Sequence, residues 1–351
     1  MKQRIVISRH FKSELAKTLS ETEHDSIFVL TDSNTYKLCW PVIAKFFTLR
    51  HAHVITIPSG DNHKTLEYLT KVWLALDENN ATRHSCMINL GGGMITDLGG
   101  FAASTFKRGI DFINVPTTLL AMVDASVGGK TGINFNGLKN EIGVFNDSKF
   151  VILDTSWLKT LDNANIRSGY AEMLKHSLLS NEKMWAQHIS FDLATPDLNQ
   201  LSDMVKESVA VKERIVNSDP LEHGMRKALN LGHTVGHAFE SFSFRKNNGK
   251  GLLHGYAVAF GLVCELYLSA IKTGFPTDKM HQTVSFIRDN YGTFDITCDD
   301  YAELIRLMHH DKKNVGQHIN FTLLSDVGGI QVNQTATEEE IKEALDFFRE
   351  G

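Results

Sequence analysis

Two histidines stand four residues apart in the stretch "NLGHTVGHAFE" (230–240). Residues at positions i and i+4 lie one above the other on a helix, so His233 and His237 could bind one metal ion. The metalloprotease pattern H-E-x-x-H is absent, because Thr234 follows His233. From spacing alone, the pair could hold a metal, transfer protons or fill an apolar core.

Three glycines, Gly91 to Gly93, lie between a predicted strand and a helix that we expect to begin near Thr96-Asp97. Glycines let backbone amides approach a phosphate, and a helix N-terminus favours negative charge. The spacing is not G-x-G-x-x-G, so the usual dinucleotide fingerprint is missing. A tight turn between strand and helix is the alternative interpretation.

Polar residues also follow two earlier predicted strands. Asp32 and Asn34 end the second strand, and Ser59-Gly60 ends the third, with Lys64 just beyond. Open α/β sheets bind ligands at the carboxyl ends of their strands. Three such strand ends favour a nucleotide site more than any one of them does.

The elements that position these residues fall into two groups. Before residue 155, helical patterns such as 64–76 alternate with short apolar runs, which predicts a largely parallel sheet covered by helices; the runs are "RIVIS", "SIFVLTD", "HVITIP", "CMINLGGG", "DFINVP" and "FVILD". From about Leu158 helical patterns dominate, with one further candidate strand at 319–324. They include 198–216, 233–242, 301–311 and a final helix whose capping box is Thr337 and Glu340.

We therefore expect an α/β domain over residues 1–157 and a mostly helical domain over 158–351, with a cleft between them. The 351 residues carry a formal charge of −5, which argues against a nucleic-acid partner. The four cysteines form no C-x-x-C pair, so they indicate neither a disulfide framework nor a thiolate zinc site. We find no signal peptide and expect a cytoplasmic enzyme.

The longest apolar stretch, 252–271, is long enough to cross a membrane. It contains His254 and Glu265, and its small residues suit close helix packing. We interpret it as a buried core helix and expect no membrane partner.

The segment "VPTTLLAMVDASVGGKTGINFNGLKN" (115–140) is dense in small and ionic residues. A surface loop with solvated lysines would not require its "SVGGKTG" frame. Here the sequence closely resembles the 3-dehydroquinate synthase family of sugar phosphate cyclases. The resemblance covers nearly the whole chain in order, through "GGGMITDLGGF", "FKRGI", "VPTTLLAMVD", "KNEIGVF", "SGYAEMLKH", "LNLGHTVGHAFE", "LHGYAVAFG" and "DKKN".

The resemblance answers the question of the two histidines. It implies a zinc ion, which Co²⁺ could replace, held by Glu172, His233 and His254 on separate helices. One carboxylate and two imidazoles leave a coordination position open for a substrate oxygen. His237 matches a family residue that serves the substrate through hydrogen bonding and proton transfer.

The family's substrate, 3-deoxy-D-arabino-heptulosonate 7-phosphate, carries a carboxylate and a phosphate, which require cations or aligned donors. Lys175 follows Glu172 by three residues, so a helix would place both on one face. Among the matching residues we assign orientation and proton transfer to Lys130, Asn140, Lys175, Asn230 and His237. The remaining substrate-binding matches are Arg108, Asp124, Lys139, Lys212, Arg226 and one of Lys312 or Lys313.

The family also binds NAD in its N-terminal domain. Two departures from the family pattern concern Asp61-Asn62-His63, where a glutamate is common, and Tyr256, which replaces an acidic residue and removes a potential partner of the metal ligands. The positions that match NAD-binding residues are Asp32, Asn34, Asp61, Lys64, Gly92, Gly93, Asp97, Thr117, Thr118, Lys139 and Thr160.

The resemblance implies a homodimeric lyase of aromatic amino acid biosynthesis (the shikimate pathway). NAD would transiently oxidise the substrate, phosphate would leave, the hydride would return, and an aldol closure would form 3-dehydroquinate. A metal-dependent polyol dehydrogenase shares the G-G-G-x-x-x-D turn but does not need the lysine set. Another sugar phosphate cyclase would not need Lys139-Asn140, Arg226 and Asn230, which suit a carboxylated substrate. An inactive scaffold would show gaps in the ligand or cation set, and we find none.

Overall fold

The computed structural model describes residues 3–246, 251–309 and 319–350. The chain divides into two compact units. The first comprises residues up to Asp162 together with Asp197–Val209, and the second comprises Asn163–Pro196 and the chain from Ala210 onward. Helix α8 (Leu198–Ser218) therefore contributes to both. The expected division into domains 1–157 and 158–351 stays a prediction.

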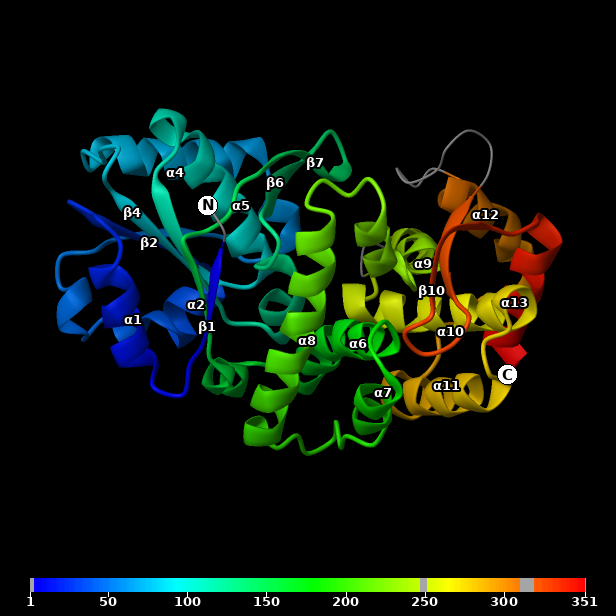
Figure 1. Cartoon of the computed structure of the whole chain (residues 1–351). Helices are drawn as coiled ribbons and strands as arrows, with labels where there is room; N and C mark the ends of the chain where they lie inside the picture. Colours follow the sequence, from blue (N-terminus) through cyan, green and yellow to red (C-terminus); the bar gives the residue numbers. More distant parts are fainter. Residues whose placement is uncertain (1–2, 247–250, 310–318, 351) are drawn as a thin grey trace. The chain divides into compact units, whose positions relative to one another are not determined.

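The first unit is built on a six-stranded sheet in which every pairing is parallel (Figure 1). All six apolar runs named from the sequence form its strands, so the predicted parallel sheet is confirmed. In spatial order the strands are β1 (Arg4–Ile7), β8 (Phe150–Leu153), β5 (Asp111–Pro116), β4 (Cys86–Gly91), β2 (Ile27–Asp32) and β3 (His53–Ile57). Strands β2, β4 and β8 are buried along their whole length, as their unbroken apolar runs require.

The helices of the first unit pack on this sheet. Leu69, Val72 and Leu76 form the buried face of α4 and share a core with the buried side chains of α5 and the sheet. Helix α1 contacts β8, and α2 contacts β2. The bounds are α1 (Phe11–Ser20), α2 (Ser33–Leu38), α3 (Trp40–Ile43), α4 (Leu66–Glu78) and α5 (Gly93–Thr105).

The start of α5 corrects one expectation. We expected this helix to begin near Thr96-Asp97, but it begins at Gly93. Gly92 precedes it with an extended backbone, and Thr96 donates its hydroxyl to the Gly93 carbonyl within the first turn. The glycine turn itself therefore starts the helix.

A second sheet of the first unit was not predicted. Strands β6 (Lys130–Phe135) and β7 (Leu138–Phe145) form an antiparallel hairpin. Asn136 and Gly137 connect them with φ of 48° and 79°, the left-handed conformations that Asn-Gly hairpin turns adopt. Strand β7 is exposed throughout and carries charged residues, so it lacks the apolar alternation on which strand prediction depends.

The second unit is mostly helical, as expected. Its helices, besides the C-terminal part of α8, are α6 (Asn163–Leu178), α7 (Glu182–Ile189), α9 (His233–Lys246), α10 (His254–Thr273), α11 (Thr277–Tyr291), α12 (Tyr301–His309) and α13 (Glu338–Glu350). The candidate strand is confirmed as β9 (Asn320–Leu324), and an unpredicted β10 (Ile330–Thr335) pairs with it. The predicted capping box is also confirmed, since Thr337 Oγ1 accepts from the Glu340 amide at 3.2 Å and Glu340 accepts from the Thr337 amide at 2.7 Å.

Helix α10 corresponds to the longest apolar stretch of the chain. By length and composition it could cross a membrane, yet 72% of its most apolar window is buried within the structure. This burial is typical of a core helix, as the sequence predicted. Short helical segments complete the fold, of which η4 is a π-helix and the others are 3-10 helices: η1 (Phe47–Leu49), η2 (Asp61–His63), η3 (Phe106–Arg108), η4 (Ala121–Ala125), η5 (Thr155–Thr160), η6 (Met225–Asn230) and η7 (Cys298–Asp300).

Candidate metal centre and nucleotide site

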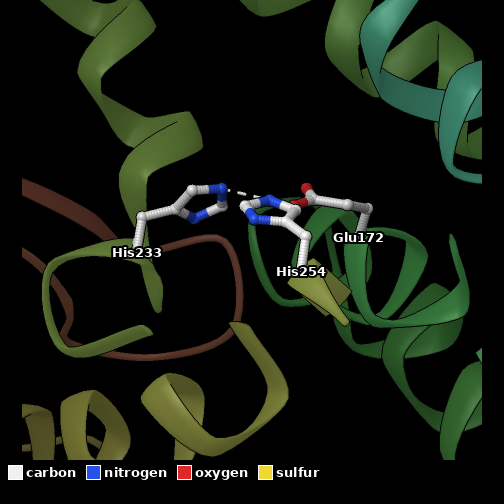
Figure 2. A group of neighbouring side chains, drawn as sticks. All are labelled: Glu172, His233 and His254. Atoms are coloured by element: carbon white, nitrogen blue, oxygen red, sulfur yellow. Dashed lines mark ion pairs between the residues drawn. The ribbon is translucent and has the colours of Figure 1, made fainter. Parts of the chain in front are cut away.

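Three helices of the second unit bring Glu172, His233 and His254 together (Figure 2). One potential ligand atom from each lies within 4.8 Å of the other two. His233 Nε2 is 3.2 Å from Glu172 Oε1, and His254 Nε2 is 3.6 Å from the same oxygen. These are the three residues to which the resemblance assigned metal binding, and they come from α6, α9 and α10.

The chemistry of this cluster fits a divalent cation. Glu172 is fully buried, and its carboxylate faces Lys175 and the Nε2 atoms of the two histidines. Each histidine uses its other ring nitrogen elsewhere: Nδ1 of His233 lies 3.1 Å from the Leu231 carbonyl, and Nδ1 of His254 lies 3.1 Å from Glu240 Oε2. Both partners are acceptors, so each Nδ1 is placed to donate a proton and each Nε2 faces Glu172, where it could bind a cation.

The electrostatics of the cluster favour an ionised carboxylate. Burial alone would raise the pKa of Glu172, but Lys175 and His233 outweigh it and hold that pKa well below its usual range. Burial likewise opposes the charged form of His254, yet hydrogen bonds to Glu172 and Glu240 raise its pKa to about 10. Buried charges are tolerated only when paired in this way.

His237 lies beside the cluster without joining it. It is one helical turn beyond His233 on α9, and its ring centroid is 5.3 Å from that of His233 and 5.9 Å from that of His254. Spacing alone allowed both histidines as ligands, whereas only His233 belongs to the group whose ligand atoms meet. The substrate role of His237 stays a prediction.

Lys175 connects the cluster to the predicted anion-binding residues of the second unit. The side chain is buried, pairs with the Glu172 carboxylate one turn earlier, and donates to the Leu229 carbonyl at 2.8 Å. Leu229 belongs to η6, which also carries Arg226 and Asn230. Arg226 is buried as well and donates to the Pro220 carbonyl at 2.6 Å. Lys212, on α8, is a further buried cation.

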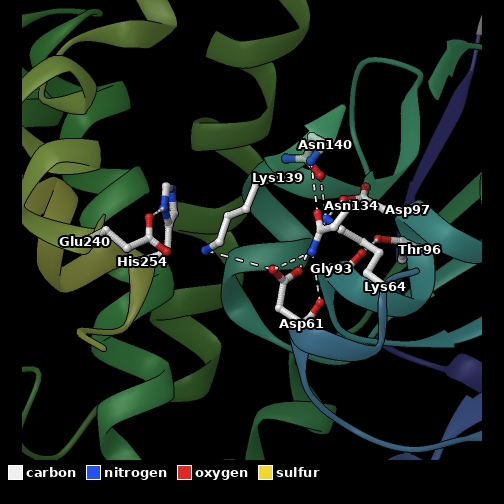
Figure 3. Close-up of polar contacts among 10 residues, drawn as sticks. All are labelled: Asp61, Lys64, Gly93, Thr96, Asp97, Asn134, Lys139, Asn140, Glu240 and His254. Carbon is white, nitrogen blue, oxygen red and sulfur yellow. Dashed lines mark hydrogen bonds and ion pairs between the residues drawn. The ribbon is translucent and has the colours of Figure 1, made fainter. Parts of the chain in front are cut away.

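In the first unit, predicted nucleotide-binding residues gather around Lys64 (Figure 3). Its Nζ lies 3.0 Å from Asp97 Oδ2, 3.4 Å from Asp61 Oδ1 and 2.5 Å from Asn140 Oδ1. Lys139 Nζ lies 3.9 Å from Asp61 Oδ2. Burial lowers the pKa of Lys64, but Asp97 and Asp61 reverse that effect and raise it. Burial raises the pKa of Asp97, and Lys64 only partly opposes it.

Apart from Thr160 in η5, the other predicted nucleotide residues lie at the carboxyl ends of β2, β4 and β5. The strand order reverses direction between β2 and β4, which is where open α/β sheets bind ligands. A Cβ on Gly92 would lie 3.0 Å from the Thr118 side chain, and one on Gly93 would lie 3.2 Å from Ala125 Cβ, so glycine keeps the start of α5 open. This turn fits a pyrophosphate at a helix N-terminus.

Several of these residues also have a structural role. Asp32 caps α2 by accepting from the amides of Asn34 and Thr35 at 2.8 and 3.0 Å. The Thr117 amide donates to the Gly91 carbonyl at 2.9 Å. Thr160, in η5, donates to the Trp157 carbonyl at 2.7 Å.

Arg108 lies in a different part of the first unit from the Lys64 cluster. Arg108 follows α5 with a left-handed backbone (φ 68°) and lines a hollow of about 510 Å³ with Arg83, Asp111 and Lys149. None of the described residues around Lys64 lines that hollow. Lys130 is exposed at the start of β6, and Asp124 lies in η4. Lys312 and Lys313 lie outside the described residues.

Glu240, the partner of His254, was not predicted from the sequence. Tyr256 was expected to deprive the ligands of a carboxylate, but its ring packs against Tyr291 at 5.1 Å, and Glu240 supplies that carboxylate from α9. A signal was present, because His233, His237 and Glu240 follow a spacing of i, i+4 and i+7 on one helix face.

The fold places the chain in a structural class whose solved members include enzymes with NAD⁺ and a metal ion bound. A solved 2-deoxy-scyllo-inosose synthase, complexed with carbaglucose-6-phosphate, NAD⁺ and Co²⁺, shares the fold with a TM-score of 0.85 at 22% identity, covering 99% of this chain and 96% of that one. The 2-epi-5-epi-valiolone synthase of Streptomyces hygroscopicus, with NAD⁺ and Zn²⁺ bound, gives a TM-score of 0.83 at 22% identity, covering 100% and 97%. An iron-containing alcohol dehydrogenase from Thermotoga maritima shares it less closely, with a TM-score of 0.66 at 13% identity, covering 99% and 98%.

Within that class, the amino-acid sequence selects one family. Family models described as 3-dehydroquinate synthase N-terminal and C-terminal match residues 54–168 and 169–314. A 3-dehydroquinate synthase of Parabacteroides distasonis is 52% identical, covering 99% of this chain and 98% of the relative. One from Pyrococcus furiosus is 38% identical, covering 95% and 96%. The chain belongs to the 3-dehydroquinate synthase family, which resolves the choice left open among related cyclases and dehydrogenases at the level of family.

Proposed function

We propose that this enzyme converts 3-deoxy-D-arabino-heptulosonate 7-phosphate to 3-dehydroquinate and phosphate, using NAD and a divalent cation, Zn²⁺ or Co²⁺. The observation that carries the proposal is the meeting of Glu172, His233 and His254 beside the buried Lys175. A relative named 3-dehydroquinate synthase is 52% identical to this chain, which supports the same reaction. The assignment to the shikimate pathway follows from the family.

Residues of the second unit would bind the metal ion and orient the substrate. When bound, the metal ion polarises a substrate hydroxyl or carbonyl oxygen, and NAD accepts and returns a hydride. His237 would hydrogen-bond the substrate hydroxyl at the metal and move its proton. Lys175 would stabilise the Glu172 carboxylate and orient the substrate together with Asn230. Arg226 and Lys212 would bind the anionic groups of the substrate.

On the cofactor side, the Lys64 cluster and the Gly92-Gly93 turn would hold the ribose and phosphate groups of NAD. Lys130, Lys139, Asn140 and Asp124 would act on the substrate or on the bound cofactor, as the resemblance implies. The reaction that the family resemblance implies would oxidise a substrate alcohol transiently, eliminate phosphate, return the hydride and close the opened ring by an aldol reaction. Because hydride uptake and return would cancel, no NADH should accumulate.

The test is a stoichiometric assay of the purified protein with NAD, Zn²⁺ and the heptulosonate phosphate. We expect equal amounts of phosphate and dehydroquinate, no net NADH, and loss of activity after chelation. Net NADH would indicate a dehydrogenase instead. Turnover of a phosphorylated sugar that lacks the carboxylate, with none of the heptulosonate, would indicate another cyclase.

Substitution of Glu172 tests whether this residue binds the metal ion. Glu172→Gln should lower zinc retention and activity together, because a neutral amide is a weaker ligand. Normal zinc content and activity in that variant would contradict the ligand assignment. The homodimer and the cytoplasmic location that the resemblance implies stay predictions.

A further inference from the structure

A second buried carboxylate stands behind the metal centre. Glu265, on α10, has no exposed surface. Its Oε2 accepts from the Gly232 amide at 2.6 Å, and its Oε1 accepts from the amides of Thr234 and Val235 at 3.0 and 3.2 Å. The first amides of a helix have no partner within the helix, so a carboxylate from α10 serves here as the cap of α9.

These three amides lie on both sides of His233. The residue before it, Gly232, turns with φ of 78°, and the carbonyl of Leu231 then faces the His233 ring, 3.1 Å from Nδ1. One carboxylate therefore fixes the backbone that carries the imidazole and the turn that presents the carbonyl accepting its Nδ1 proton. Together these contacts direct Nε2 of His233 toward Glu172.

The glycines of the two helices allow Glu265 to reach this position. Gly261 lies one turn before Glu265 on the same face of α10. A Cβ on Gly261 would overlap the Gly232 carbonyl oxygen and lie 2.7 Å from the Gly236 amide nitrogen, and one on Gly236 would lie 2.9 Å from the Ala257 carbonyl oxygen. The backbones of α9 and α10 therefore touch, and the next turn of α10 meets the start of α9.

The charge of Glu265 matters as well as its shape. Taking an ionised carboxylate out of water is costly unless donors surround it. Backbone amides and the partial positive charge of a helix N-terminus provide that environment. A glutamine of the same size would present an NH₂ group to at least one backbone N–H, so the cap would be broken.

We propose that Glu265 is a positioning residue of the metal centre: it holds the first turn of α9 so that His233 presents Nε2 to the cation. The inference rests on the proposed metal role of His233. Glu265 bonds the backbone amides on either side of His233 and acts on the ligand through that backbone.

The test is zinc affinity, measured on the full-length protein by competition with a chromophoric chelator. Glu265→Gln should weaken zinc binding about 10- to 100-fold, as loss of a partner that orients a ligand does. The visible spectrum of the Co²⁺-loaded protein should change, because the geometry at His233 changes. Glu265→Asp, which keeps the charge on a shorter side chain, should recover part of the affinity.

A matched control separates positioning from loss of stability. Leu345, on α13, is also fully buried, and Leu345→Ala should lower the melting temperature while zinc affinity and the Co²⁺ spectrum stay as in the wild type. Equal zinc affinity and an unchanged spectrum in Glu265→Gln would overturn the inference. A wild-type protein that binds no zinc, or binds it independently of Glu172, would instead overturn the proposed function.

Hydrogen exchange on the wild type tests the inference even if the variants do not fold. The amides of Gly232, Thr234 and Val235 should exchange slowly, although the first amides of a helix ordinarily exchange fast. Fast exchange at all three would contradict a carboxylate cap at this position.

Discussion

The Oε2 atom of Glu240 lies 3.1 Å from Nδ1 of His254, so a carboxylate on α9 orients an imidazole on α10. The two residues belong to different helices and are both shielded from solvent in large part. A carboxylate in this position fixes the ring and makes its other nitrogen a stronger metal ligand. In the proposed metal centre, Glu240 would thus supply the carboxylate that Tyr256 cannot.

We expect Glu240→Gln to weaken zinc binding by about tenfold or more. The amide can still accept from Nδ1, but it no longer raises the basicity of the ring. Zinc content after dialysis against a graded series of chelator concentrations measures the effect. Glu67→Gln is the control, because Glu67 pairs only with Lys71 on the exposed face of α4 among the described residues. If Glu240→Gln retained zinc as well as this control does, Glu240 would not support the metal ligands.

Replacing Lys64 should damage the first unit and leave the metal centre intact. Lys64→Met removes the cation between Asp61 and Asp97, and a buried charge that loses its partner costs about 3 kcal/mol of stability. We expect weaker NAD binding in titration calorimetry, a lower free energy of unfolding and an unchanged zinc content. Protonation of Asp97 would remove its unpaired charge and reduce the loss of stability. The free energy of unfolding of Lys64→Met should therefore depend on pH.

Lys71→Met is the matched control for this prediction. Lys71 forms an ion pair of similar length with Glu67, but both side chains are exposed, so the pair is screened by water. We expect no measurable change in NAD affinity or stability. Equal effects of the two substitutions would show that the Lys64 cluster has no special role.

The buried His188 should make the second unit sensitive to acid. Its Nδ1 lies 2.7 Å from the Met184 carbonyl, its Nε2 has no hydrogen-bond partner among the described residues, and burial lowers its pKa from 6.5 to about 4. Below pH 6.5 the unfolded chain therefore binds a proton that the folded chain excludes. Stability falls as the pH falls from 6.5 to 4, by about 3 kcal/mol from this group.

Urea unfolding at pH 7, 5.5 and 4.5 measures this dependence. His188→Gln should be less stable than the wild type at pH 7, and its stability should decline less over the same range. Other carboxylates titrate in both proteins, so the difference between the two curves reports His188. Parallel curves would contradict a neutral, buried imidazole.

Features of the fold could be predicted only where they constrain the residue types of a continuous segment. The buried strands could be predicted because β2, β4 and β8 exclude water on both faces and leave unbroken apolar runs. The hairpin of β6 and β7 could not, since its exposed strand carries Lys139, Asn140 and Glu141 in place of an alternating pattern. The candidate metal ligands were predicted from the family resemblance alone. They lie on three separate helices, so no fixed interval in the sequence relates them.

Glu240 and Glu265 also differ in how far the sequence could reveal them. Glu240 shares a helix face with His233, so its spacing could have revealed it. Glu265 bonds to backbone amides, which every residue carries, so no residue type on α9 identifies its partner. Its only signal was an acidic residue inside an apolar helix, which the sequence analysis used to argue against a membrane span.

The close approach of α9 and α10 gives the last prediction. Gly261→Ala would force its methyl group into the Gly232 carbonyl, so the helices must separate and move His233 away from Glu172. Overpacking of this kind costs about 1–3 kcal/mol or more, and we expect zinc affinity to fall with it. Gly274→Ala is the control: it strains a left-handed backbone (φ 79°) at the end of α10 but meets nothing within 4 Å, so it should cost about 1 kcal/mol and leave zinc affinity unchanged. Thermal unfolding and zinc competition on both variants separate the effect on stability from the effect on zinc affinity. If Gly261→Ala bound zinc as tightly as the wild type, the position of the start of α9 would not depend on this contact.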